Sequence, residues 1–173
     1  MADCRLLRHD VFMGPDRWER EVAELWAMAE RDDPGATLTM MEMLVARRPE
    51  GDPIALFELA SAHDFVGRSY DAVPLYREAL AGGLDPEREH RAGIQLASSL
   101  RVLGRAEEAI SVLAGISSSS PGVAGARDAF LALALQDQGH SSEALRVALH
   151  ALASTLPEYG VAVSRYADAL VDH

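Results

Sequence analysis

One sequence pattern recurs three times in this chain, each time starting at a glycine. The copies read GRSYDAVPLYREAL from Gly67, GRAEEAISVLAGI from Gly104 and GHSSEALRVALHAL from Gly139. Gly104 lies 37 residues after Gly67, and Gly139 lies 35 residues after Gly104. A period of this length is typical of stacked helix pairs. The repeat therefore predicts units that bury their apolar faces against one another, because one such unit cannot bury its own face.

Apolar and small residues recur at spacings of three and four on both sides of each glycine, which places them on one stripe of a helix. After the glycines these residues are Ala72, Tyr76 and Ala79; Ala109, Leu113 and Ile116; and Ala144, Ala148 and Ala151. Before the glycines they are Leu56, Leu59, Ala60 and His63; Leu96, Ala97 and Leu100; and Leu131, Ala132 and Leu135. Each copy thus predicts a helix, a glycine turn and a second helix.

Prolines mark the joints between the copies. The pairs Asp52–Pro53, Asp85–Pro86 and Ser120–Pro121 each predict the start of a helix. In these pairs the first side chain caps the helix, and proline takes the first helical position, where a missing N–H is harmless. About three extra residues around GGLDPEREH make the period uneven, which predicts a longer first helix in the second copy.

These residues together resemble the tetratricopeptide repeat. Its pattern runs from a large residue to a leucine followed by glycine or alanine, an aromatic residue, the turn glycine, a second aromatic residue, an alanine, a large aromatic residue, a second alanine and a terminal proline. Residues 53–86 match it with Leu56, Leu59, Ala60, Gly67, Ala72, Tyr76 and Ala79. Residues 90–123 keep Leu96, Ala97, Gly104, Ala109 and Pro121, but have Leu113 and Ile116 in place of an aromatic residue and an alanine. Residues 125–158 keep Leu131, Ala132, Gly139, Ala144 and Ala151. The resemblance implies an all-α superhelix of antiparallel helix pairs.

The repeat register also suggests a layout for the whole chain. Residues 1–14 have no clear period and are expected to form an N-terminal arm, with one tetratricopeptide domain over 15–173. A degenerate repeat is expected at 18–51, with Asp32 at its turn. At the other end, 158–171 carries Val163, Tyr166, Ala167 and Leu170 at helical spacing. We expect a capping helix there, since the last repeat needs its open apolar edge covered.

Charge and composition exclude several classes of function. The net charge of −11 argues against nucleic acid and anionic membrane partners, which require a dense basic patch. The single cysteine, Cys4, excludes an internal disulfide and a zinc site of several thiolates, and it suits a cytoplasmic protein. No apolar run approaches the roughly 20 residues of a membrane span, and no charged-then-apolar leader is recognised, so we expect a soluble, unexported protein.

Two residue types are absent from the sequence, lysine and asparagine. Without lysine the chain has no Schiff-base chemistry, no P-loop and no protein-kinase active site. Because both missing residues use AT-rich codons, the composition also suggests a GC-rich bacterial source.

Signals of catalysis are weak. Glu87 and His90 have the i, i+3 spacing of a di-iron carboxylate site, but no second Glu-x-x-His is present, and a solvated helix start is the simpler interpretation. The segment GISSSSPG lacks the second glycine of a nucleophile elbow and is interpreted as a linker. No two histidines are four residues apart. We therefore expect no catalytic residue, metal or cofactor, and no enzyme.

Two groups of side chains have open roles. Met40, Met41 and Met43 share one expected helix, where adaptable packing is favoured over a soft peptide-binding surface. Trp18 and Trp26 are eight residues apart on another helix. A core role is the commoner one for tryptophan, with an exposed anchor as the alternative.

The resemblance implies that the first helix of each pair lines a concave surface used for binding. By register, this surface comprises Val22, Trp26, Phe57, Ser61, Asp64, Phe65, Arg91, Ile94, Ser98, Arg101, Ala129, Leu133 and Gln136. Aromatic residues and arginine are enriched at binding hot spots. The expected partner-binding residues are Trp26, Phe57, Ser61, Phe65, Arg91, Ile94, Ser98 and Arg101.

One departure from the family restricts the partner. The tetratricopeptide subset that grips the C-terminal carboxylate of chaperones uses lysine and asparagine, and this chain has neither. Arg91 and Arg101 still offer forks that pair with a carboxylate.

The sequence therefore predicts a noncatalytic module that binds an unidentified peptide or protein segment in its groove. The alternative is a self-associating assembly protein that uses residues 6–13 or its end helices as a homo-oligomer contact. Enzyme activity is a distant third hypothesis.

Overall fold

The structure, a computed structural model, describes residues 17–29, 33–116 and 121–170. Within these ranges the regular structure consists of nine α-helices and no strand, which confirms the all-α fold class. The helices are α1 (Arg17–Met28), α2 (Pro34–Val45), α3 (Pro53–Phe65), α4 (Ser69–Gly82), α5 (Pro86–Val102), α6 (Ala106–Gly115), α7 (Pro121–Asp137), α8 (Ser141–Ala153) and α9 (Gly160–Asp168). The expected arm 1–14, Asp32 and Ser120 lie outside the described residues.

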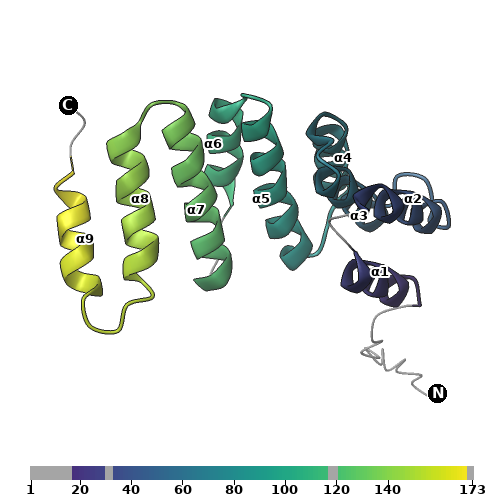
Figure 1. Ribbon diagram of the computed structural model, residues 1–173, viewed down its shortest axis with the longest axis horizontal. Coiled ribbons are helices and arrows are strands. Elements are labelled where there is room, and N and C mark those ends of the chain that lie inside the picture. Colours follow the sequence, from purple (N-terminus) through teal and green to yellow (C-terminus); the bar gives the residue numbers. More distant parts are fainter. Residues whose placement is uncertain (1–16, 30–32, 117–120, 171–173) are drawn as a thin grey trace, which may run out of the picture.

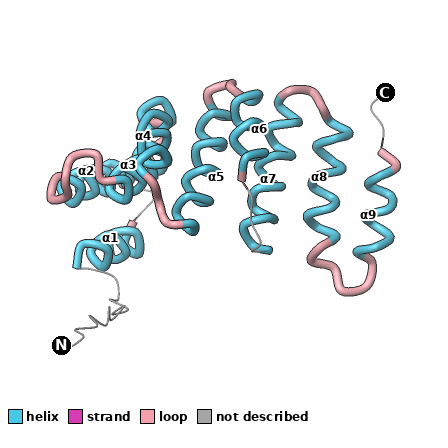
Figure 2. The backbone as a smooth tube through the Cα atoms, turned by 180° about the vertical axis from the view of Figure 1, so that it is seen from behind, coloured by secondary structure: helices cyan, strands magenta, loops and turns pink. Residues whose placement is uncertain are grey.

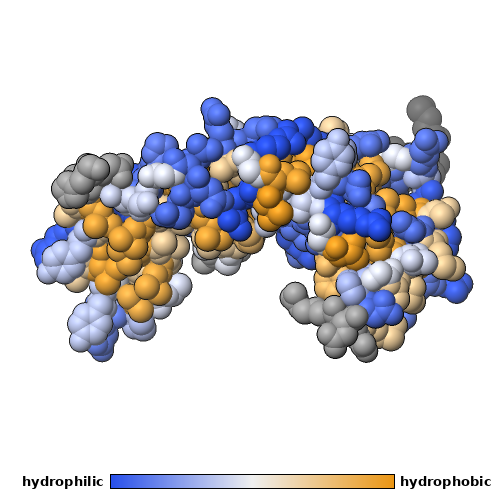
Figure 3. All heavy atoms as spheres, turned by 45° about the horizontal axis from the view of Figure 1, so that its top comes forward, coloured by the Kyte–Doolittle hydropathy of each residue, from blue (hydrophilic) through white to orange (hydrophobic). Residues whose placement is uncertain are grey.

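The helices stand in a row from the N-terminal to the C-terminal end of the molecule (Figure 1). Each packs mainly on its neighbours in sequence. The α5–α6 and α7–α8 loops lie along one long edge of the row and the α8–α9 loop lies along the other, so that the helices that these loops join run antiparallel (Figure 2). The first helices of successive pairs also touch, α3 with α5 and α5 with α7. This places α3, α5 and α7 on the inner side of a curved stack. Figure 3 shows the resulting arch, which is hollowed below its middle.

The three glycines that define the repeat make the same turn. Gly67, Gly104 and Gly139 have φ values of 76°, 74° and 84°, a left-handed conformation that favours glycine. At each turn the N–H of the next residue donates to the carbonyl oxygen five residues before it. Arg68 donates to His63 at 2.8 Å, and Arg105 and His140 make the equivalent bonds to Leu100 and Leu135 at 2.9 Å. The turn glycine therefore fixes one helix register in all three repeats.

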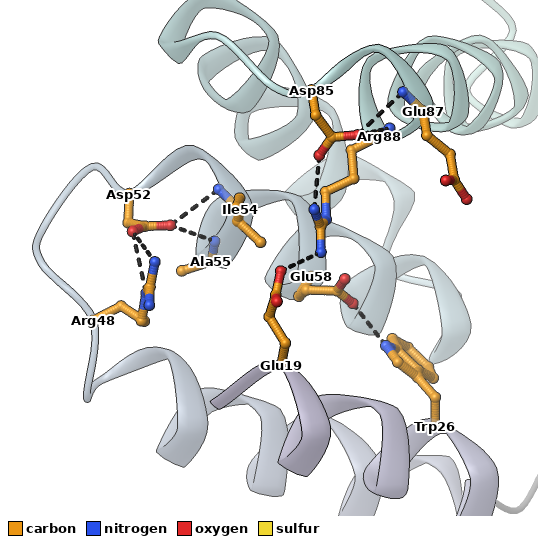
Figure 4. Close-up of polar contacts among 10 residues, drawn as sticks. All are labelled: Glu19, Trp26, Arg48, Asp52, Ile54, Ala55, Glu58, Asp85, Glu87 and Arg88. Carbon is orange, nitrogen blue, oxygen red and sulfur yellow. Dashed lines mark hydrogen bonds and ion pairs between the residues drawn. The ribbon is translucent and has the colours of Figure 1, made fainter. Parts of the chain in front are cut away.

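Aspartates begin two of the helices as the proline pairs predicted. The Asp52 carboxylate accepts from the N–H groups of Ile54 and Ala55 at 3.0 Å, and Asp85 accepts from those of Glu87 and Arg88 at 3.1 Å (Figure 4).

A third cap was not anticipated from the sequence: Asp33 accepts from the N–H of Ala36 at 3.3 Å and starts α2. The longer first helix of the second copy is confirmed, because α5 has 17 residues against 13 in α3. α7 also has 17 residues. It begins at Pro121, the proline at which a helix start was predicted, four residues before the start of the predicted repeat 125–158.

A continuous core runs through α3 to α6. Tyr76, Leu100 and Leu113 are fully buried in it, and the buried alanines Ala72 and Ala109 let the paired helices approach closely. Such close packing is the main source of stability for stacked helix pairs.

A second, smaller core joins α1, α2 and α3. It contains Trp18, Leu25 and Met41, and the indole N–H of Trp18 donates to the carbonyl oxygen of Leu44 at 2.8 Å. The packing role favoured for the three methionines holds only for Met41, because the side chains of Met40 and Met43 are exposed.

The C-terminal helices bury smaller residues. Their fully or nearly buried hydrophobic positions are mostly alanines, and large apolar side chains reach the surface, seen as an orange patch at the left of Figure 3. The exposed leucines and valine at this end are Leu133, Leu145, Leu152, Leu156 and Val161. The rings of Tyr159 and Tyr166 are exposed as well. Across the described residues, no helix combines the length and the apolar character that crossing a membrane demands.

Candidate functional site

The inner side of the stack holds two adjoining pockets, of about 340 Å³ and 260 Å³, between α1, α3 and α5. The larger is lined by Trp26, Glu58, Ser61, Asp64, Phe65, Arg91 and Gln95. The smaller shares Trp26, Glu58 and Arg91, and it adds Glu19, Val22, Ala23, Asp85, Glu87 and Arg88. We call the two pockets together the α1–α3–α5 groove. Because its walls come from three helices, the groove exists only when the repeats are stacked.

An aromatic pair forms one wall of the larger pocket. The rings of Trp26 and Phe65 meet edge to face, with centroids 5.9 Å apart and an interplanar angle of 81°. The indole N–H of Trp26 also donates to Oε2 of Glu58 at 2.7 Å (Figure 4). Since the ring is held at both an edge and its N–H, this wall is fixed before any partner arrives.

Glu58 is the most deeply placed charge in the groove, with 9% of its surface exposed. Burial raises the pKa of its carboxyl group above the ordinary value. The hydrogen bond from Trp26 and the positive charges of Arg91 and Arg88 oppose that shift only in part. The groove floor therefore holds a carboxylate whose charge is poorly compensated.

An ion pair joins the two outer walls of the groove. Arg88 on α5 donates to Glu19 on α1 at 2.6 Å and to Asp85 at 2.7 Å (Figure 4). The two helices are far apart in the sequence, so this contact locks the first repeat onto the third across the groove.

Asp64 also lines the larger pocket, where three hydroxyl groups hold its side chain. Its carboxylate accepts hydrogen bonds from the hydroxyls of Ser99 at 2.6 Å, Ser69 at 3.2 Å and Tyr76 at 3.4 Å. Burial raises the pKa of Asp64, and these bonds counter it in part. The network links α3, α4 and α5, which makes the groove floor rigid.

Comparison with known proteins agrees with this architecture. A family model described as the tetratrico peptide repeat matches residues 53–170. The chain belongs to the tetratricopeptide repeat family. Neither the curated proteins nor the solved structures contain a match to it. The matched range starts at Pro53, so α1 and α2 precede it, although they pack in the same row and supply Trp26 to the groove.

Four of the residues expected from the tetratricopeptide register line the larger pocket together: Trp26, Ser61, Phe65 and Arg91. Ser61 is buried, and its hydroxyl donates to the carbonyl oxygen of Phe57 at 3.0 Å. Arg91 is exposed and makes no ion pair among the described residues. These four come from α1, α3 and α5, as the first-helix register predicts.

Two other expected residues lie in the core. Phe57 is 1% exposed and packs on Tyr76 with centroids 6.3 Å apart, and Ile94 is buried too. The guanidinium of Arg91 covers the Phe57 ring at 5.6 Å. Phe57 is therefore not an exposed anchor for a partner, because its helix position faces the second helix of its own repeat.

Ser98 and Arg101 lie further along α5 and do not line either groove pocket. Arg101 donates to Asp137 on α7 at 3.0 Å, so its guanidinium already has a carboxylate partner. Among the described residues, no three His, Cys, Asp or Glu side chains come together as metal ligands.

The register missed Glu58, Gln95, Glu19 and Arg88 as groove residues. Glu58 carried a usable signal, since it is the one charged residue in PIALFELASA, the segment that begins at Pro53. A single acid within an apolar helix indicates a polar partner or a site. The contact between Glu19 and Arg88 gave no such signal, because it depends on how the repeats stack.

Proposed function

We propose that this protein is a noncatalytic interaction module that holds a peptide or protein segment in the α1–α3–α5 groove. Membership of the tetratricopeptide repeat family supports an interaction role. The observation that carries the proposal is the larger pocket itself, which at about 340 Å³ has room for a side chain. The hydrogen bond from Trp26 to Glu58 fixes its aromatic wall of Trp26 and Phe65. Fixed aromatic walls lower the entropy lost on binding.

Site-specific photo-crosslinking tests the groove as the contact surface. A benzophenone amino acid replaces Arg91 at the pocket rim, and, as a matched control, replaces Tyr70 on α4, which is 80% exposed. The proposal expects a partner protein to crosslink in cell lysate from position 91 and not from position 70. Equal crosslinking from both positions, or crosslinking only from position 70, contradicts it.

Self-association is the second candidate function, and one observation favours it. The C-terminal end exposes apolar side chains, among them Val161 on α9, 86% exposed, and Leu145 and Leu152 on α8. A second copy of the chain can bury such apolar surface at the end of a helical stack. Residues 6–13, the other candidate contact, lie outside the described residues.

Light scattering over a range of concentrations tests this second function. A dimer that becomes a monomer in a Val161→Asp variant supports it, and a monomer at all concentrations contradicts it.

A further inference from the structure

Negative charge dominates the α1–α3–α5 groove. Its lining has five carboxylates against two guanidiniums; the acids are Glu19, Glu58, Asp64, Asp85 and Glu87, and the bases are Arg88 and Arg91. Arg88 is held by both Glu19 and Asp85, so its charge is already matched. Arg91 is the remaining counter-charge, and it lies exposed at the rim. The potential of the groove therefore attracts cations.

Glu58 offers one unused acceptor at the centre of this field. Oε2 accepts the indole N–H of Trp26, whereas Oε1 has no hydrogen-bond donor among the residues that the structure describes. The side chain lines both pockets and is 9% exposed, so water reaches this oxygen only from the groove. A positively charged donor makes a stronger hydrogen bond to such a groove-facing carboxylate oxygen than water or a neutral donor does.

The walls around this oxygen suit a long cationic side chain. Trp26 and Phe65 present apolar ring surface on which a methylene stem can pack, while an aromatic ring also attracts a cation near its face. Gln95 and Ser61 also line this pocket and add polar groups. A pocket of about 340 Å³ has room for one such side chain and its neighbours on a peptide.

We propose that the larger pocket binds a lysine or arginine side chain of the partner segment, whose charged head donates to Glu58. This rests on the proposed function, and it adds the chemical class of residue that the partner must present. Arg91 competes with that residue for the same carboxylate, because its positive charge acts on Glu58 from the rim. The acidic net charge of the whole chain, −11, steers a basic segment toward the groove.

NMR spectra of the ¹⁵N-labelled full-length protein test this proposal directly, because the indole N–H of each tryptophan gives its own signal. The chain has two tryptophans, and a Trp18→Phe variant assigns the signal of Trp26. The probe is N-acetyl-L-argininamide, compared with N-acetyl-L-citrullinamide, which has nearly the same shape and no charge. The proposal expects the arginine probe to move the Trp26 signal in a saturable way and to leave Trp18 in place, with little response to citrulline.

Two substitutions that are expected to change the affinity for the arginine probe in opposite directions sharpen the test. Glu58→Gln keeps an acceptor for Trp26 and removes the charge, and it is expected to weaken binding of the arginine probe about tenfold. Arg91→Gln removes the competing cation and is expected to strengthen binding about two- to threefold. Glu78→Gln, an exposed acid on α4, is the control that leaves binding unchanged.

Three results overturn the inference. The first is an equal shift with the citrulline probe, and the second is a stronger shift with N-acetyl-L-glutamate amide. The third is a movement of the Trp26 signal, without any probe, in a variant with Arg5→Gln and Arg8→Gln, because the chain's own arm is then the occupant.

The two proposals fail in distinguishable ways. If a partner crosslinks from position 91 while the arginine probe moves nothing, the groove binds a segment but the pocket does not select a cation. If the probe binds through Glu58 while crosslinking comes equally from position 70, the pocket is cation-selective but the partner contact lies elsewhere.

Discussion

The central helices α3–α6 and the C-terminal helices α7–α9 are built on the same glycine turn, yet they bury side chains of very different size. Nine residues after the turn glycine stand Tyr76, Leu113 and Ala148 in the three repeats. Tyr76 and Leu113 are fully buried, whereas Ala148 is exposed. The turn thus sets the register of a helix pair, while the volume of the side chains at the facing positions sets how much core the pair builds.

The position ten residues before each glycine repeats this trend. Phe57 and Ile94 are buried there, but Ala129 is exposed. The α1–α3–α5 groove lies over the better packed part of the stack, where the hydrogen bonds of Asp64 also join three helices. A rigid base suits a preformed pocket. The C-terminal helices, with large apolar side chains at the surface, are instead suited to contact with another chain.

Truncation of the largest fully buried side chain, Tyr76, should change the free energy of unfolding the most. Tyr76→Ala is expected to lower the free energy of unfolding by about 3–5 kcal/mol, because it leaves a cavity and takes a donor from Asp64. Tyr70→Ala on the same helix, where the ring is exposed, should change it by less than about 0.5 kcal/mol. Urea denaturation followed by circular dichroism measures both, and similar losses would contradict the burial of Tyr76 in the core.

A leucine pair compares the two regions directly. Leu113→Ala in α6 is expected to cost about 3 kcal/mol, because that side chain is fully buried. Leu152→Ala in α8 should cost less than about 1 kcal/mol, since the side chain is 50% exposed. Thermal unfolding of the two variants tests this difference. An equal loss shows that α8 is covered in solution, for example by a second copy.

Substitution of the turn glycine should destabilise the central and the C-terminal helices by similar amounts. Gly104→Ala and Gly139→Ala are each expected to cost about 1–2 kcal/mol, because both residues have positive φ and neither position is crowded. The control is Gly122→Ala near the start of α7, where the space is also open but φ is not positive; it should be neutral or slightly stabilising. Hydrogen exchange resolves the local cost of each turn. A much smaller cost at Gly139 than at Gly104 breaks the equivalence of the two turns.

The smallest effect should come from the buried acid of the groove. The folded-state pKa of Glu58 is raised, so ionisation of this carboxyl group opposes folding, and its contribution to stability becomes less favourable as pH rises through that pKa. Glu58→Gln should therefore be more stable than the parent near neutral pH, by less than about 1 kcal/mol. The gap should narrow as pH falls and Glu58 takes up its proton.

Denaturation of parent and variant between pH 4 and pH 8 measures this gap. The comparison cancels the acid sensitivity of groups such as Asp52 and Asp85, whose pKa values are lowered by hydrogen bonds that outweigh their partial burial. A gap that widens on acidification contradicts the raised pKa. Higher stability together with weaker binding of the arginine probe is the combined result expected of a residue kept for binding.

Much of the fold could be predicted because its signals are local. A turn glycine with positive φ, an aspartate before a proline and an apolar stripe all act within a few residues, so the roles of Gly67, Asp52 and Tyr76 follow from their neighbours in the sequence. The site was harder. The first-helix register found Trp26 and Phe65, but it also selected Phe57, which lies in the core. One helix face spans both the groove and the core, and periodicity does not separate the two.

The sequence by itself determined the helix pairs, their turns and caps, and their membership of a stacked repeat, because each depends on backbone conformation or on a stripe along one helix. Only the tertiary structure decided which side chains share the groove. Glu19 meets Arg88 and Trp26 meets Glu58 across separate repeats, at distances set by the stacking of α1, α3 and α5. Such contacts depend on how far each core layer holds its neighbours apart, and that spacing follows from the packed volumes of many side chains at once.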